Sequence, residues 1–249
     1  MGVRLERDGA AALVILDWPE VRNALSLEAA REVCAAIAQA AADSSFSGLV
    51  LTGEGAFCAG ANLKGVVERA GMPEAERKKI VYGAMQGMVR ALVDFPVPTV
   101  AAIDGPAIGL GFDLALACDS RLIGPQGWCM QGWGRIGVIP GTGGEYLLRL
   151  RAPSLLWRLL ETQPRIYAAD AERWNIGEST NDDSARARAV ARINSYGHMS
   201  RDALVAYADL HRMDLRKGLD EHLEAAVNRQ VKLLASPDLK GKVDKLLMK

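Results

Sequence analysis

The chain has 249 residues, of which 49% are hydrophobic, which is enough for a substantial core in one large or two small domains. Its 30 basic and 30 acidic residues balance, so charge favours neither a nucleic acid nor an anionic membrane as a partner. No apolar run approaches the ~18 residues of a transmembrane helix, and the first ten residues lack the apolar core of a signal peptide. We therefore expect a cytoplasmic protein without a membrane segment.

Short apolar runs alternate with amphipathic segments through most of the chain. Ser26 can cap the first amphipathic segment, and Glu28 lies in its first turn. The alternation predicts a parallel sheet covered by helices. The predicted strands cover residues 11–16, 49–52, 99–103 and 121–123. The predicted helices cover residues 27–42, 80–93, 114–118, 147–160 and 168–174, and residues 64–77 are expected to form a mobile loop or a short helix.

The composition changes near residues 181–184, and three further helical patterns follow at 185–194, 201–212 and 219–234. The lysines of the Lys-rich segment 238–249 are expected to form a solvated face, with contact to coenzyme A phosphates as the alternative. All three histidines lie in this part of the chain, but their spacings fit no common ligand pattern, so we expect no metal site. The four cysteines show no CxxC spacing and are predicted to be free thiols.

A glycine-rich segment, IDGPAIGLGFDLALACD at 103–119, joins a predicted strand to a predicted helix. Such a strand–turn–helix connection directs free backbone N–H groups at one point, which attracts negative charge. A second turn of the same kind, FCAGANLK at 57–64, follows the predicted strand 49–52. If the two turns converge, their N–H groups would form a two-donor oxyanion hole.

These two motifs, with PEVRNALS before them and IPGTGG after them, have the order and spacing of the crotonase (enoyl-CoA hydratase/isomerase) superfamily. The chain resembles that family over roughly residues 3 to 180. The resemblance implies an α/β fold, with a spiral of ββα units over 1–183 and a C-terminal helical region over 184–249 that serves oligomerisation. It also implies an acyl-CoA thioester as substrate, no cofactor beyond that coenzyme A, and assembly as a homotrimer or hexamer.

By this resemblance, the oxyanion donors are the backbone N–H groups of Ala61 and Leu110. They would stabilise the enolate that forms when a thioester loses an α-proton or gains a group at its β-carbon. The family usually has glycine where Leu110 stands. We expect the leucine side chain either to narrow the acyl pocket or to shift the turn.

Hydratases of this family pair two carboxylates, which share the handling of water and proton. The first falls on Asp113, where the family commonly has glutamate, and the second falls on Trp133, which is no acid. The two-carboxylate mechanism therefore cannot simply be carried over, and we expect Asp113 to be the main acid/base. Glu145 is the nearest acid that could substitute, although a charge at the start of a helix explains it more simply.

The resemblance also implies contacts to the substrate. The family's backbone contacts to coenzyme A fall on Arg22, Ala24, Leu25, Ala59, Ala61 and Leu63. Trp133 resembles the aromatic residue of the superfamily's 4-chlorobenzoyl-CoA dehalogenase, and it either forms a wall of the acyl pocket or packs in the core. That enzyme's nucleophilic aspartate falls on Gly141, which argues against dehalogenation. We place Pro140 and Gly141 in the substrate site.

Three hypotheses about function remain open. The first is an enoyl-CoA hydratase/isomerase-type enzyme with Asp113 as its acid/base. The second is a specialised lyase, decarboxylase or hydrolase for a bulky or aromatic acyl-CoA, and the third is an acyl-CoA-binding homologue without turnover. Other enzyme classes are disfavoured, because the sequence has no GxSxG elbow, phosphate-binding GxxxxGK[ST] loop or HExxH pair.

Overall fold

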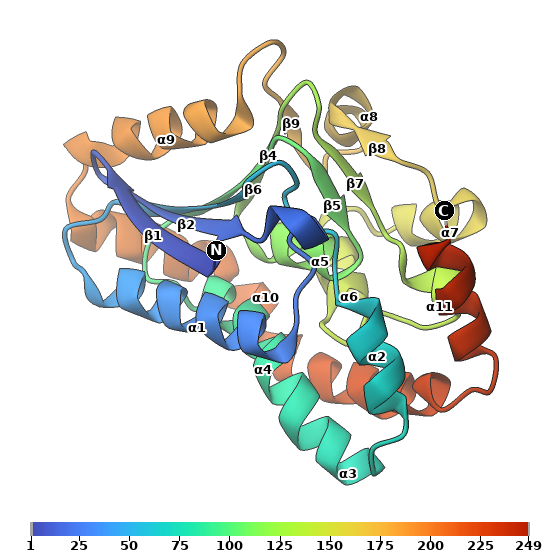
Figure 1. The fold of residues 1–249 in the computed structure, drawn as a ribbon. Helices are drawn as coiled ribbons and strands as arrows, with labels where there is room; N and C mark the ends of the chain where they lie inside the picture. The colour runs from blue at the N-terminus through green and yellow to red at the C-terminus, as the bar shows by residue number, and fades with distance from the viewer. Residues whose placement is uncertain (1, 249) are drawn as a thin grey trace.

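The computed structural model describes residues 2–248, apart from the side chains of Arg69, Ile80 and Val81. Its main sheet has six strands in the order β1-β2-β3-β4-β6-β9 (Figure 1). Strand β1 is antiparallel to β2, and the other neighbours are parallel. The strands are β1 (Gly2–Asp8), β2 (Ala11–Asp17), β3 (Gly48–Gly53), β4 (Thr99–Ile103), β6 (Ser120–Ile123) and β9 (Glu178–Ser179).

Strand β2 shows why the predicted strands are continuous apolar runs. Ala12, Val14 and Leu16 belong to the large core that packs under the helices of one face. The alternate residues, among them Leu13 and Ile15, belong to a second core on the opposite face. A strand that is buried on both faces has no position for a polar side chain, so it loses the alternating pattern of a half-exposed strand.

Helices cover both faces of this sheet (Figure 1). Helix α9 (Ala185–Ser195) packs on one face, and α1 (Leu27–Ala42), α4 (Gly83–Val93) and part of α10 (Arg201–Leu234) enclose the large core on the other. Helix α1 begins as predicted, because the Ser26 hydroxyl accepts the Ala29 N–H at 3.1 Å. The remaining helices are α2 (Leu63–Ala70), α3 (Glu74–Arg77), α5 (Leu110–Ala117), α6 (Gly144–Arg151), α7 (Leu155–Thr162), α8 (Ala168–Arg173) and α11 (Leu239–Leu247).

A smaller sheet of three strands stands beside the main one. It contains β5 (Pro106–Ile108), β7 (Trp128–Met130) and β8 (Ile166–Tyr167), and β5 and β7 are parallel. Three-residue 3₁₀ turns occupy Pro19–Val21 and Tyr196–His198, a longer one occupies Trp133–Ile136, and Lys78–Tyr82 is a π-helical turn. Only Gly109 separates β5 from α5. Helix α5 therefore begins at Leu110, four residues earlier than predicted.

Two sequence predictions about the helices are wrong, each for a physical reason. The single helix expected over 147–160 is two helices, α6 and α7, because Pro153 cannot donate a backbone hydrogen bond. The two helices expected around Gly218 are one, α10, in which this glycine leaves room for Tyr146: a Cβ there would lie 2.9 Å from the tyrosine Oη.

The described lysines of the tail, Lys240, Lys242 and Lys245, are exposed as expected. They lie on α11, whose apolar Leu239 and Val243 are buried beside α2.

The predicted α/β class, with its parallel sheet and C-terminal helical region, is confirmed, whereas the division at residues 183 and 184 stays a prediction. Residues 64–77, expected to be a loop or short helix, contain α2 and α3. Within residues 2–248, no helix combines the length and the apolar character that crossing a bilayer requires.

A buried ion pair fastens α10 to the edge of the main sheet. The Arg212 guanidinium is 2% exposed, donates to both carboxylate oxygens of Asp119, and also donates to the carbonyls of Phe95 and Val97. Asp119 accepts the N–H and hydroxyl of Thr99 as well. Burial alone would raise the pKa of Asp119, but the hydrogen bonds and charge of Arg212, together with Thr99, outweigh it and hold this pKa below its ordinary value.

Replacement of Asp119 by asparagine should therefore be strongly destabilising. Arg212 would stay buried without its counter-charge, and breaking such a pair costs about 3–5 kcal/mol of the free energy of unfolding. Asp220→Asn is the matched control, because its pair with Arg90 also joins α10 to α4 but is exposed, and it should cost under about 1 kcal/mol. Urea denaturation measures the loss of unfolding free energy in each variant. Equal losses would contradict the conclusion that the buried Arg212–Asp119 pair stabilises the fold.

Candidate active site

The two glycine-containing turns lie side by side and are hydrogen-bonded to each other. The N–H of Cys58 donates to the Pro106 carbonyl, and the N–H of Ile108 donates to the Cys58 carbonyl, each at 2.9 Å. Gly60 and Gly109 have φ values of +98° and +53°, which favour glycine because it has no Cβ. The turn after β3 therefore lies against β5 and the turn that follows it, which meets the condition set by the sequence analysis.

The two predicted oxyanion donors lie in these turns. Leu25 pairs with the groups on either side of Ala61, since it donates to the Gly60 carbonyl and accepts the Asn62 N–H. Leu110 is the first residue of α5, where an N–H has no acceptor within its helix. In the described part of the chain, neither the N–H of Ala61 nor that of Leu110 donates to a protein acceptor. Both groups are therefore available to a ligand.

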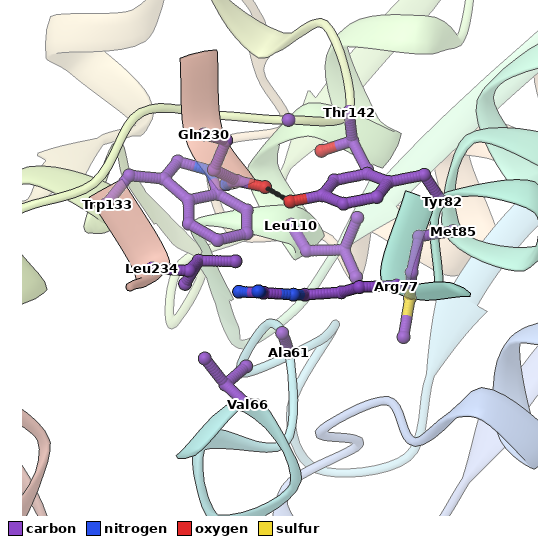
Figure 2. A pocket seen from close by; sticks show the side chains of 11 residues that line it. Ala61, Val66, Arg77, Tyr82, Met85, Leu110, Trp133, Thr142, Gln230 and Leu234 are labelled. Carbon is purple, nitrogen blue, oxygen red and sulfur yellow. Dashed lines mark hydrogen bonds between the residues drawn. The ribbon is translucent and has the colours of Figure 1, made fainter. Parts of the chain in front are cut away.

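Ala61 and Leu110 line one small cavity of about 50 Å³ (Figure 2). The Leu110 side chain is buried and narrows this cavity, and α5 still follows the turn directly. None of the described residues that line the cavity is acidic. The lining consists of Ala61, Val66, Arg77, Tyr82, Met85, Leu110, Trp133, Gly141, Thr142, Gln230 and Leu234.

Asp113 lies directly behind this lining, in the first turn of α5. Its side chain is buried, and its Oδ2 accepts the indole N–H of Trp133 at 3.0 Å and the hydroxyl of Thr142 at 2.6 Å. Gly144 makes room for it, because a Cβ at that position would lie 1.8 Å from Oδ1. Asp113 itself is not part of the lining, but both of its hydrogen-bond donors are. The Asp113 carboxyl group is thus linked to the cavity by its hydrogen bonds with Trp133 and Thr142.

Burial raises the pKa of Asp113 to about 7, even though the hydrogen bonds from Thr142 and Trp133 act to lower it. Desolvation penalises the charged carboxylate, and no cation in the described part of the chain is among the causes that shift its pKa. A carboxyl group with a pKa near neutrality can both accept and return a proton under ordinary conditions.

Trp133 and Glu145 have different positions relative to the cavity. The Trp133 side chain lines the cavity and also packs against the hydrophobic core, and its contact with an acyl group stays a prediction. Glu145, considered as a substitute for the missing carboxylate, lies outside the lining. Its carboxylate pairs with His222 at 2.9 Å and with Arg149 at 3.6 Å. Glu145 is thus held by two basic side chains at the start of α6.

The residues predicted to contact coenzyme A lie around the Ala61 turn. The Arg22 carbonyl accepts the N–H of Ala59 at 2.9 Å, and Leu25 forms a bridge to Ala61. Leu63 begins α2, and Ala24 immediately precedes Leu25. Gly141 lines the cavity, whereas Pro140, the residue before it, is buried outside the lining. The contacts of these residues with a substrate stay predictions.

Sequence reasoning did not find three polar residues of the cavity, namely Arg77, Tyr82 and Gln230. Arg77 ends the short helix α3, Tyr82 ends the π-helical turn, and Gln230 lies near the end of α10. No local motif marks them. Glutamine and arginine are mostly exposed in proteins, so the burial of these two side chains beside the cavity can be recognised only once distant helices have packed together.

Asp113 should make stability depend on pH. Its pKa is about 7 in the folded protein and about 3.9 in an unfolded chain, so the folded state binds more protons between these values. The free energy of unfolding should then fall as pH rises from 4 to 7, by at most about 1.4 kcal/mol per pH unit. Asp113→Asn cannot titrate, and the difference between its denaturation curve and that of the wild type isolates the effect. Parallel curves across this range would contradict the raised pKa.

The family profile "Enoyl-CoA hydratase/isomerase" matches residues 6–245. The chain is 35% identical over 148 residues to probable enoyl-CoA hydratase EchA14 of Mycobacterium tuberculosis, covering 59% of this chain and 56% of the relative. It is 34% identical to enoyl-CoA hydratase domain-containing protein 2, mitochondrial, of Bos taurus, covering 73% and 63%. These matches span less than two thirds of either relative. The match to probable enoyl-CoA hydratase echA6 of Mycobacterium bovis, at 33% identity, spans 90% of this chain and 93% of the relative.

Solved structures show the same fold. The enoyl-CoA hydratase from Bacillus halodurans has a TM-score of 0.90 at 22% identity, with 98% of this chain and 100% of that chain covered. An enoyl-CoA hydratase/isomerase from Mycobacterium paratuberculosis has a TM-score of 0.89 at 22% identity, with 98% and 97% covered. At such low identity the likeness concerns the fold alone. From the match of the family profile across nearly its whole length, the chain belongs to the enoyl-CoA hydratase/isomerase family.

Proposed function

We propose that the protein is an acyl-CoA isomerase of this family, which moves the double bond of an enoyl-CoA through an enolate. One observation carries the proposal. The carboxyl group of Asp113 is hydrogen-bonded to two residues that line the cavity, and none of the described lining residues is acidic. The names of the relatives and the family profile support an acyl-CoA thioester as the substrate.

The thioester oxygen would accept the N–H groups of Ala61 and Leu110. As a proton leaves the substrate, negative charge develops on this oxygen, and preorganised donors stabilise it at little reorganisation cost. Loss of one such donor typically costs about 3 kcal/mol of transition-state stabilisation. The N-terminus of α5, to which Leu110 belongs, adds the favourable end of a helix dipole.

We place Thr142 between Asp113 and the substrate. The Thr142 hydroxyl lies 2.6 Å from Asp113 Oδ2 and lines the cavity, so it extends the reach of a side chain that is one methylene shorter than glutamate. In the first step, a proton of the substrate α-carbon passes to the threonine oxygen as the hydroxyl proton passes to Asp113, and the C–H electrons form the enolate, which is conjugated with the C3–C4 double bond. The reverse transfers then deliver the proton to the γ-carbon, and the double bond moves to C2–C3 as the thioester carbonyl re-forms.

This sequence of transfers needs one proton carrier and consumes no water. Hydration instead requires a group that orients and deprotonates water and a group that delivers a proton to the α-carbon. The position that carries the family's second carboxylate holds Trp133, whose indole N–H already donates to Asp113. The arrangement therefore supports isomerisation over hydration. Assembly as a trimer or hexamer stays a prediction.

Conversion of a 3-enoyl-CoA to its conjugated 2-enoyl isomer tests the proposal through the rise of thioester absorbance. Thr142→Val removes the hydroxyl at nearly constant shape and should lower kcat by about 100-fold with little change in KM, because a positioned proton carrier is worth that much. Thr142→Ser keeps the hydroxyl and is the matched control, which should retain most of the activity.

Wild-type turnover that Thr142→Val leaves intact would remove Thr142 from the proton path. Wild type that consumes a 2-enoyl-CoA by hydration faster than it isomerises a 3-enoyl-CoA would contradict isomerisation. Binding of both thioesters without turnover of either would favour the non-catalytic homologue.

A further inference from the structure

The cavity is lined by a buried cation that forms no ion pair within the described part of the chain, although, after the larger effect of Lys78, its charge is the smallest cause that lowers the pKa of Glu74. Arg77, the last residue of α3, is 5% exposed and lines the same cavity as Ala61 and Leu110. Its Nη2 donates to the Met72 carbonyl at 3.1 Å. Its Nε and Nη1 are buried and have no hydrogen-bond partner in the described part of the chain. The N–H donors on two of the three guanidinium nitrogens therefore have no acceptor among the described residues.

Neighbouring groups do not supply the missing anion. The carboxylate of Glu74, three residues earlier, pairs with Lys78. The Tyr82 hydroxyl donates to the Gln230 amide oxygen, and the amide nitrogen of Gln230 donates to the Ile139 carbonyl, so the two polar side chains across the cavity are engaged with each other and the backbone. A guanidinium stays charged at every accessible pH, and a buried charge is costly unless it is paired.

The guanidinium lies within the cavity. In Figure 2 it extends between Leu110 and Leu234 on one side and Ala61 and Val66 on the other. Apart from it, this part of the lining is apolar, which would strengthen its attraction to an anion. Arginine presents a planar fork of donors that matches a carboxylate in a bidentate pair.

We propose that Arg77 binds a carboxylate on the acyl group, so that the substrate is the coenzyme A monothioester of a dicarboxylic acid. This inference rests on the proposed function, because it takes the thioester oxygen to lie at the N–H groups of Ala61 and Leu110. The phosphates of coenzyme A cannot supply the anion in that pose, since the long pantetheine arm separates them from the thioester. The anion must then belong to the acyl group.

An acyl group can enter only if the guanidinium moves, because the guanidinium extends across a cavity of about 50 Å³. Arg77 stands at the junction of α3 with the π-helical turn Lys78–Tyr82, a kind of turn often found at functional sites. The acyl group displaces the guanidinium along the cavity as it enters, and the terminal carboxylate then fixes its new position.

Isothermal titration calorimetry with two matched thioesters tests the inference. Glutaryl-CoA and pentanoyl-CoA both carry five-carbon acyl groups, but only the first ends in a carboxylate, and neither has a double bond to isomerise. Wild type should bind glutaryl-CoA at least about tenfold more tightly, since hydrogen bonds to charged groups are the strong ones. Arg77→Met should abolish or reverse this preference while it leaves pentanoyl-CoA binding within about threefold.

Lys79→Met is the matched control, because Lys79 is an exposed cation two residues away that does not line the cavity. Lys79→Met should keep the tenfold preference for glutaryl-CoA. If this variant loses the preference, the effect comes from general electrostatics and the role of Arg77 is overturned. Equal wild-type affinity for the two thioesters would overturn the inference without needing any variant, and would leave the proposed function standing. Failure of wild type to bind either thioester would overturn the proposed function itself.

Discussion

The backbone pairing between the Cys58 turn and strand β5 is the constraint on which the site depends. It leaves no room for a side chain at Gly111, where a Cβ would lie 2.2 Å from the Cys58 carbonyl oxygen. The two turns are held in contact, and Ala61 and Leu110 line one cavity. Because main-chain hydrogen bonds fix both donors, their placement does not depend on side-chain freedom.

A second constraint is the space around Asp113. Gly144 and the hydrogen bonds of Trp133 and Thr142 accommodate a carboxyl group that burial makes hard to ionise. Burial makes the charged form of Asp113 unfavourable in the folded protein, and for the same reason it places the pKa of Asp113 near neutrality. The family resemblance aligns Trp133 with a second acid, and the Trp133 indole N–H donates to Asp113, so we propose a site with one proton carrier beside an apolar wall.

Local patterns predicted the helix at 27–42, the buried strands of the main sheet and the two converging turns, because each depends on capping, continuous apolar runs or glycine. They failed where a distant packing contact decided the outcome. Gly218 lies within α10, where it leaves room for Tyr146, and α2 packs against the apolar residues of α11. Arg77 and Gln230 reach the cavity from α3 and α10, and no short segment of sequence encodes that meeting.

The most direct test of the central claim, a single buried carboxyl that moves one proton without adding water, is to run the reaction of a 3-enoyl-CoA in D₂O and analyse the products by NMR and mass spectrometry. Because Asp113 is 3% exposed, the proton abstracted from the α-carbon should be returned to the γ-carbon before it exchanges fully with solvent. The account predicts a 2-enoyl-CoA in which a substantial share of the hydrogen added at the γ-carbon derives from the substrate rather than from D₂O. A 3-hydroxyacyl-CoA containing solvent oxygen as the main product would contradict it.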